Sequence, residues 1–388
     1  MKNFKHEVLI VGGFGHIGLP LGILFAEKGL STCLYDIDKK AFNIIKKGQM
    51  PFTEYGAQKL LKKNLISKKL KLSLNINSIK DAKNVIITIG TPVDEYLNPK
   101  TKQFVELFKT IIPYLNKSQN VIIRSSVFPD TCKRIFSLLK NKKFNVSYCP
   151  ERIVQGYGIE ELQKLPQIVS GFSKNAINNS SILFKNISPR IIKTSVKEAE
   201  LIKLFTNSLR YIQFATANQF YMICENFNVN YKSLRNSLID GYERAKWLPS
   251  AGFASGPCLM KDTMQLAAFN KNNFPLGHSA MLLNEGLPNF IVDGLLKKYD
   301  LTKKKVGVLG MTFKANVDDT RDSLSFKLAK ILEFKGAKVL CSDEFAKNKD
   351  FVSKEKVLKE ADIIIIGTPH KIYKELKIPK RIKVINIW

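Results

Sequence analysis

A glycine-rich hexapeptide between an apolar run and a helical stretch restricts, more than any other feature, what this chain can fold into. Residues 6–12 (HEVLIVG) are typical of a buried strand, and residues 17–27 of the helix after it. In the turn between them, GFGHIG, the first glycine would permit a tight turn, the second a close approach of a pyrophosphate, and the third close helix packing. We therefore predict a dinucleotide-binding unit whose cofactor contacts are Gly13, Gly15, His16, Ile17 and Gly18.

The last residue of the second predicted strand, 31–36 (STCLYD), indicates which dinucleotide binds. This residue is Asp36, 18 positions after Gly18. A carboxylate at that place accepts hydrogen bonds from the hydroxyls of an adenosine ribose and repels a 2′-phosphate. We therefore predict NAD, rather than NADP, as the cofactor.

Short apolar runs alternate with helical stretches at both ends of the chain. Between the two ends, residues 196–227 keep a helical period of apolar side chains without Pro or Gly, which predicts one long helix. The chain is thus expected to be an α/β protein, with two Rossmann-like units of doubly wound parallel sheet joined by a central helical domain. The further strands predicted are 84–90, 120–125, 306–311, 337–343 and 361–370, with a helix at 323–335, and the domains are 1–190, 191–301 and 302–388.

The chain carries a net charge of +29, with 62 Lys and Arg against 33 Asp and Glu. The lysines are scattered and form neither a tail nor a basic helix, so a lysine-rich solvated surface and attraction of a polyanionic small substrate both explain the charge. A nucleic-acid-binding protein is a third reading, although the sequence has no recognisable binding motif. We expect no nucleic-acid partner.

Cysteine spacing and the N-terminal sequence bear on location. The six cysteines form no CxxC pair, so we expect no metal site and no disulfide scaffold, which suits the reducing cytoplasm. The apolar stretch 8–26 resembles a signal peptide only superficially, because it contains His16, Pro20 and five glycines. We expect no targeting segment and no membrane span.

The heptapeptide GPCLMKD at residues 256–262 carries a candidate nucleophile. If Pro257 occupies the first position of a helix, Cys258 lies in its first turn, where exposed N–H groups and the helix dipole favour a thiolate. Asp262, four residues on, then shares the face of Cys258 and is placed to orient water. A buried structural cysteine is the competing interpretation.

Lys203 and Asn207 stand four residues apart on the predicted long helix. A cation and an amide presented together can stabilise a developing oxyanion. A solvated lysine beside a surface asparagine is the more common situation, so the spacing alone does not choose between the two.

Taken together and in order, these motifs resemble the UDP-glucose/GDP-mannose dehydrogenase family over nearly the whole chain. Several matching segments in one order are far more specific than any one of them. They are VGGFGHIGLPLGILFAEKG, YDID, Thr91-Pro92, SSVFPDT, CPERIVQG, AELIKLFTN, GPCLMKD and GMTFKANVDDTRDS.

The resemblance implies an NAD-dependent oxidation of the CH2OH group of a nucleotide sugar to a carboxylate. Cys258 would capture the aldehyde as a thiohemiacetal, whose oxidation leaves a thioester that water hydrolyses. Lys203 and Asn207 match the residues that stabilise oxyanions, and Asp262 matches the aspartate that acts as a base with an ordered water. Glu151 matches the glutamate proposed to activate water for hydrolysis.

The resemblance also implies contacts to cofactor and substrate. Thr91 and Ser126 would line the nicotinamide side, and Arg321 would reach the cofactor from the third domain. A homodimer is implied, because the segment around Arg244 serves the neighbouring subunit's site in this family. The implied substrate contacts are Arg152, Ile153, Arg210, Arg244 and Lys314.

Three positions depart from the family pattern. Ser126 stands where threonine is usual, Gln155 stands where the UDP-glucose and GDP-mannose branches have glutamate, and residues 253–255 (FAS) replace a glycine-rich run. Arg152 after Pro-Glu favours the UDP-N-acetylmannosamine and UDP-N-acetylglucosamine branch. UDP-glucose and GDP-mannose stay open as substrates, and a single-hydride β-hydroxyacid dehydrogenase is a remoter alternative that would need no cysteine.

Overall fold

The computed structural model describes residues 4–91, 93–94, 100–139 and 144–388. These residues form two compact units, Met1–Thr206 and Asn207–Trp388. The boundary between the two units falls inside the longest helix. The three domain ranges expected from the sequence stay predictions.

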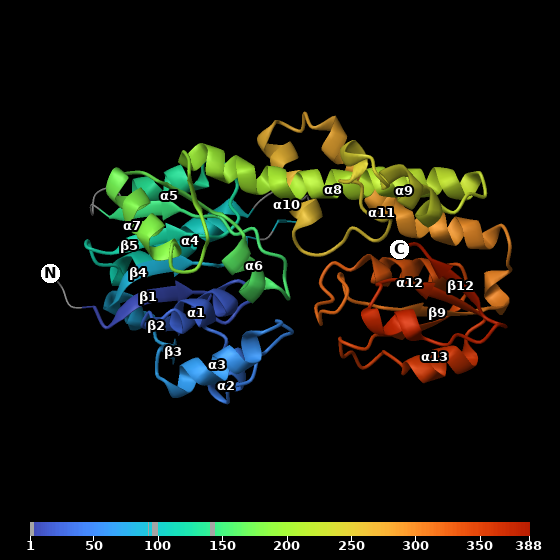
Figure 1. Ribbon diagram of the computed structural model, residues 1–388, viewed down its shortest axis with the longest axis horizontal. Helices are drawn as coiled ribbons and strands as arrows, with labels where there is room; N and C mark the ends of the chain where they lie inside the picture. Colours follow the sequence, from blue (N-terminus) through green and yellow to red (C-terminus); the bar gives the residue numbers. More distant parts are fainter. Residues whose placement is uncertain (1–3, 92, 95–99, 140–143) are drawn as a thin grey trace. The chain divides into compact units, whose positions relative to one another are not determined.

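The first unit is an eight-stranded sheet in the order β3-β2-β1-β4-β5-β6-β7-β8, with helices on both faces (Figure 1). Its pairs are parallel except for β6 with β7, which run antiparallel. The parallel part confirms the doubly wound prediction, whereas the antiparallel pair was not foreseen. The strands are β1 (His6–Val11), β2 (Thr32–Tyr35), β3 (Leu70–Ser73), β4 (Ala82–Ile87), β5 (Asn120–Ile123), β6 (Asn145–Tyr148), β7 (Gln167–Gly171) and β8 (Ile191–Lys193).

The continuous apolar run in β1 places apolar side chains on both faces of this sheet, which explains why helices cover both faces. Val8 and Ile10 lie in one buried cluster with α1, whereas Leu9 and Val11 lie in a second cluster with α4 and α5. A strand buried on both faces reads as a continuous apolar run. The helices of this unit are α1 (Gly18–Glu27), α2 (Lys39–Lys46), α3 (Ala57–Ile66), α4 (Thr101–Ile111), α5 (Thr131–Leu139), α6 (Gly158–Lys164) and α7 (Lys174–Phe184).

The predicted long helix is α8 (Val196–Asn226), which is 31 residues long and carries the division between the units. The second unit continues with α9 (Tyr231–Ile239), α10 (Leu259–Phe269) and α11 (Pro275–Leu296). Its sheet is wholly parallel, in the order β10-β9-β11-β12 (Figure 1). The remaining elements are β9 (Lys305–Leu309), α12 (Leu324–Phe334), β10 (Lys338–Ser342), α13 (Lys354–Glu360), β11 (Ile363–Ile366) and β12 (Lys383–Asn386).

One apolar core explains why the central helices and the C-terminal sheet form a single compact unit. The buried cluster includes Ala217 of α8, Leu287 of α11, Val306 of β9 and Leu328 of α12. Burial of this shared surface stabilises helices and sheet together.

Candidate active site

The glycine turn lies between β1 and α1 as the sequence predicted, but the residue that makes the tight turn differs from the one expected. The left-handed residue is Gly12, at φ +77°, so the tight turn begins one residue earlier than expected. A Cβ at Gly13 would lie 2.8 Å from the Cβ of Leu34 in β2, and one at Gly18 would lie 2.3 Å from the Gly12 carbonyl oxygen. A Cβ at Gly15 would meet only the Gly12 oxygen, at 3.7 Å. Packing therefore requires two of the glycines, while the third leaves room for a ligand at the start of α1.

Asp36 lies against this turn at the end of β2. The backbone N–H of Phe14 donates to its Oδ2 at 3.1 Å, and the carboxyl group is only half-buried. An acceptor that stays open to solvent beside a glycine turn fits the hydroxyls of an adenosine ribose.

Two other predicted cofactor residues meet at neighbouring strand ends. Thr91 follows β4 and Ser126 follows β5, and the Thr91 hydroxyl donates to the Ser126 carbonyl oxygen. Ligands of open α/β sheets bind at the carboxyl ends of the strands, so this pair stands where a nicotinamide contact is expected. Pro92, which completes the predicted motif, lies outside the described residues.

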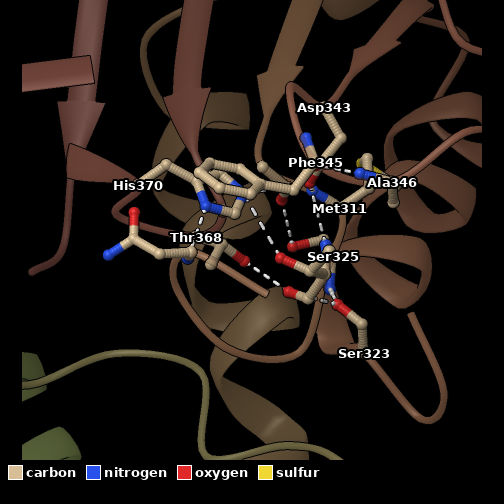
Figure 2. A network of polar contacts seen from close by, with 12 residues as sticks. Met311, Ser323, Ser325, Asp343, Phe345, Ala346, Thr368 and His370 are labelled. Atoms are coloured by element: carbon tan, nitrogen blue, oxygen red, sulfur yellow. Dashed lines mark hydrogen bonds and ion pairs between the residues drawn. The ribbon is translucent and has the colours of Figure 1, made fainter. Parts of the chain in front are cut away.

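The C-terminal Rossmann-like unit also has a carboxylate directly after its second strand, but its surroundings differ from those of Asp36 (Figure 2). Asp343 closes β10 as Asp36 closes β2, but it is fully buried and accepts from the backbone N–H groups of Met311 and Thr312 at 2.6 and 3.1 Å. His370, also fully buried, pairs with the same carboxylate at 3.1 Å and stacks on Phe345. Burial opposes ionisation, yet the hydrogen bond from His370 and those from the backbone hold the pKa of Asp343 below its usual value. Asp343 therefore serves the fold, and Asp36 is the carboxylate open to a ligand.

The candidate nucleophile lies at the beginning of α10. Cys258 is exposed and is the N-cap residue, so the helix begins at Leu259, two positions later than the prediction that Pro257 starts it and Cys258 lies in its first turn. Cys258 nevertheless stands at the N-terminal end of the helix, where the helix dipole favours a thiolate. The amide N–H of Asp262 donates to the Cys258 carbonyl oxygen at 2.9 Å, so the two residues are one helical turn apart as expected.

Asp262 brings α8 and α10 together. Its side chain is 1% exposed and accepts from the Asn207 side-chain amide at 2.5 Å and from the Lys261 ammonium group. Asn207 is itself 7% exposed, which rules out the alternative of a surface asparagine. Lys261 was not predicted, although it adjoins Asp262 in the same heptapeptide, because a lysine next to an aspartate is usually a solvated residue.

The loop before Cys258 is fixed by its glycine. Gly256 has φ +96°, and a Cβ there would lie 2.4 Å from Cδ2 of Phe313. Its N–H donates to the carbonyl oxygen of Asp322 at 3.1 Å. The 310–323 segment predicted to carry substrate and cofactor contacts therefore lies against this loop.

Arg321 belongs to that segment. Hydrogen bonds to Asp319, then the charges of Asp319, Cys258 and Asp322, raise the pKa of Arg321 against the opposing effect of burial. Cys258 is thus among the groups whose charge acts on this guanidinium. Asp319 was not predicted and binds Arg321 in a bidentate pair.

Lys203 is 8% exposed on α8, one turn before Asn207. The alternative of a solvated lysine is therefore wrong. Among the described residues it forms no hydrogen bond or ion pair, so its ammonium group is available to a ligand anion.

Glu151 is held by partners that the sequence did not reveal. Its carboxylate forms a buried ion pair with Arg124 and accepts from the backbone N–H groups of Arg152 and Ile153 at 2.7 and 2.9 Å. Arg124 also donates to Gln167 at 2.8 Å. Both oxygens of the Glu151 carboxylate therefore already accept hydrogen bonds within the first unit. The only signal for Arg124 was a lone charge at the end of the apolar run 120–125.

The remaining predicted substrate residues are placed as follows. The Arg152 guanidinium donates to the Pro166 carbonyl oxygen at 2.5 Å, and burial lowers its pKa. Arg210 is exposed on α8, and Arg244 is exposed with its guanidinium carbon 4.8 Å from the centre of the Tyr242 ring. Lys314 is partly buried, and its carbonyl oxygen accepts from Thr312.

Gln155, where the family's glutamate would be, contacts the glycine turn. Its Nε2 lies 3.0 Å from Nδ1 of His16, and the His16 ring centre is 3.9 Å from that of Phe52. The 149–156 segment is therefore linked directly to the predicted cofactor loop.

Comparison with known proteins identifies the family. Three models match in order: the NAD binding domain of the UDP-glucose/GDP-mannose dehydrogenase family at residues 7–188, its central domain at 197–285 and its UDP binding domain at 307–386. The chain belongs to the UDP-glucose/GDP-mannose dehydrogenase family. It is thus an NAD-dependent nucleotide-sugar dehydrogenase that acts on a CH–OH group.

Three relatives show how the dehydrogenase compares along its length. It is 30% identical to the UDP-N-acetyl-D-mannosamine dehydrogenase of Methanocaldococcus jannaschii, over 96% of this chain and 88% of the relative. It is 29% identical to the UDP-glucose 6-dehydrogenase of Rickettsia felis, over 94% and 87%. The solved UDP-D-ManNAc dehydrogenase of Pyrococcus horikoshii has a TM-score of 0.90 at 28% identity, over 98% and 94%.

Among the residues that the structure describes, no helix is both long and apolar enough to cross a membrane. Within the same residues, no group of three or more His, Cys, Asp or Glu side chains could hold a metal ion.

Proposed function

We propose that this dehydrogenase oxidises C6 of a UDP-N-acetylhexosamine, either UDP-N-acetylmannosamine or UDP-N-acetylglucosamine, to the uronate through a thioester on Cys258. The observation that carries the chemistry is the grouping of an exposed thiol at a helix N-terminus with a buried Asp262 one turn away, itself bonded to Asn207. A dehydrogenase that stops at one oxidation has no use for this thiol. The relatives that are UDP-N-acetyl-D-mannosamine dehydrogenases, together with Arg152 after Pro-Glu, favour an N-acetylhexosamine over glucose as the sugar.

The residues of the first unit fit NAD, which supplies the hydride acceptor for both oxidations when it is bound. Gly13, Gly15 and Gly18 with the start of α1 would hold the pyrophosphate, and Asp36 would hold the adenosine ribose. Thr91 and Ser126 would line the nicotinamide side.

The residues around α8 and α10 handle the sugar. The Sγ of Cys258 attacks the C6 aldehyde, a C–S bond forms, and the carbonyl oxygen becomes an oxyanion that takes up a proton. Lys203 and Asn207, buried one turn apart on α8, are positioned on the helix to stabilise that oxyanion. Oxidation of this thiohemiacetal gives the thioester, and water releases the uronate and the thiol. Arg210, Lys314 and Arg321 are the proposed partners of the diphosphate and cofactor.

The test is NADH formation against a panel of UDP-N-acetylmannosamine, UDP-N-acetylglucosamine, UDP-glucose and GDP-mannose. UDP-glucose belongs in the panel because of the Rickettsia felis relative. We expect two NADH per sugar and a uronate. One NADH with release of an aldehyde would refute the thioester route, and highest kcat/KM with UDP-glucose would refute the N-acetylhexosamine.

Cys258→Ala is expected to bind NAD and lose nearly all uronate formation. Cys341→Ala, in the same unit and half-buried, is the matched control and should keep its rate. Cys258→Ser would accumulate an ester, visible as a mass increase on the peptide that contains residue 258. Wild-type uronate production by Cys258→Ala would refute the assignment of the nucleophile.

We propose further that the dehydrogenase acts as a homodimer in the cytoplasm, where Cys258 stays reduced. Large aromatic side chains remain exposed in the segment around Arg244, including Tyr242 at 47% and Trp247 at 51%. Such patches mark protein interfaces. If Arg244 serves the partner's site, mixing inactive Arg244→Ala with inactive Cys258→Ala restores activity, since one site of the mixed dimer is intact. No recovery after subunit exchange would refute the shared site.

A further inference from the structure

A buried glutamine shares the face of α10 that carries Cys258 and Asp262. Gln265 follows Cys258 by seven residues and Asp262 by three. On an α-helix such spacings place the three side chains on one face, and side chains three residues apart are neighbours about 5–6 Å apart at Cβ. That separation suits one water molecule between the carboxylate and the amide.

The Gln265 amide has no protein partner among the described residues. Its side chain is fully buried, and neither Oε1 nor Nε2 forms a hydrogen bond there. Thr263, two residues earlier, is satisfied, since its hydroxyl donates to the Leu259 carbonyl oxygen at 2.8 Å. Buried amides are rarely left unpaired because desolvation is costly. A buried water molecule would satisfy both atoms of this amide.

Hydrolysis of the thioester requires a water molecule and a base. Glu151, the expected base, is bound by Arg124 and two backbone N–H groups, and Gln155 is not an acid. Asp262, which accepts from Asn207 and Lys261, is the remaining buried carboxylate of the predicted set, and it stands one helical turn from Cys258. The residue placed to hold a water beside Asp262, on the same helix face as the thiol, is Gln265.

We propose that Gln265 is a positioning residue that holds the hydrolytic water against Asp262. The proposal rests on the proposed thioester on Cys258. The water oxygen bonds to the thioester carbon and its proton passes to Asp262. The C–S bond then breaks with its electron pair on sulfur, so the uronate leaves and the proton is returned to the thiolate or solvent. No electrons are exchanged with an oxidant in this step.

The test is pre-steady-state NADH formation by Gln265→Met, which keeps the length of the side chain and removes the amide. We expect a burst approaching two NADH per subunit, followed by turnover slowed by roughly tenfold or more, as for lost water activation. The acyl adduct should accumulate on Cys258, and hydroxylamine, a stronger nucleophile than water, should restore turnover. A structural defect would not respond to hydroxylamine.

Thr263→Val is the matched control, because it removes a buried hydroxyl two residues from Gln265 on another face of the helix and should leave the burst and turnover unchanged. If Gln265→Met does not fold, Gln265→Asn carries the same test, since it withdraws the amide by one methylene. Unchanged turnover, or slow turnover with the burst also lost, overturns the proposal. A wild-type enzyme that forms no adduct on Cys258 would instead refute the proposed function.

Discussion

Gly256→Ala tests how the loop before Cys258 is held. The substitution adds one methyl group at a residue with φ +96°, where the new Cβ would lie 2.4 Å from Cδ2 and 2.9 Å from Cε2 of Phe313. Two costs therefore combine: a left-handed backbone for an alanine, and a clash with a ring that is only partly buried.

The magnitude follows from these two terms. The left-handed conformation costs an L-residue about 1–2 kcal/mol, and overpacking costs about 1–3 kcal/mol. Together they lower the free energy of unfolding by roughly 2–5 kcal/mol, less where Phe313 moves aside. For a unit of this size each kcal/mol lowers Tm by about 2–4 °C, so we expect a loss of roughly 4–20 °C.

The assay is urea and thermal unfolding of a double-mutant cycle. Phe313→Ala removes the ring, so Gly256→Ala should cost only about 1–2 kcal/mol in that background. Gly286→Ala is the control, because Gly286 lies in α11 with nothing within 4 Å of its new Cβ, and alanine there should be neutral or stabilise by about 0.5–1 kcal/mol. A Gly256→Ala protein within about 0.5 kcal/mol of wild type would refute the reasoning.

Three further predictions concern the cofactor turn and the buried pair of the second unit. Asp36→Asn keeps an acceptor for the Phe14 N–H and removes the charge, so the ratio of kcat/KM for NAD over NADP should fall by about tenfold or more; an unchanged ratio would show that Asp36 is not at the ribose. Gln155→Leu breaks the contact with His16 and should raise KM for NAD several-fold with Tm unchanged; an unaltered KM would mean that the contact does not support the cofactor. Asp343→Asn should lower the free energy of unfolding at pH 7. Because the pKa of Asp343 is held below 3.8, the wild type should lose its greater stability only as the pH falls below about 4. A stability difference that persists at pH 2 in urea titrations would contradict this.

Features set by neighbours along the chain were predictable from the sequence. The glycine turn, the carboxylate at the end of β2 and the long helix depend on local geometry and on the period of apolar residues. The errors of one residue at Gly12 and two residues at the start of α10 arise because a turn or a cap can shift without altering the pattern.

Features set by residues far apart in sequence were not predictable. Asn207 and Asp262 are separated by 55 positions, and Arg124 and Glu151 by 27. No local pattern distinguishes an arginine that neutralises a buried glutamate from one at the surface. The antiparallel β7 was missed for the same reason, since strand direction depends on tertiary pairing that five residues do not encode.

The two Rossmann-like units show why a repeated fold here yields one dinucleotide site among the described residues. Gly12 and Gly310 both have positive φ. Asp36 and Asp343 each accept a hydrogen bond from a backbone N–H group in the turn that contains the corresponding glycine. In the second unit, however, the acceptor is buried and occupied by a histidine, so no ribose can reach it. With a single cofactor site, two oxidations of one sugar require the cofactor to be exchanged between them. A covalent bond to Cys258 would hold the half-oxidised sugar during that exchange, which gives the proposed nucleophile a physical purpose beyond lowering a barrier.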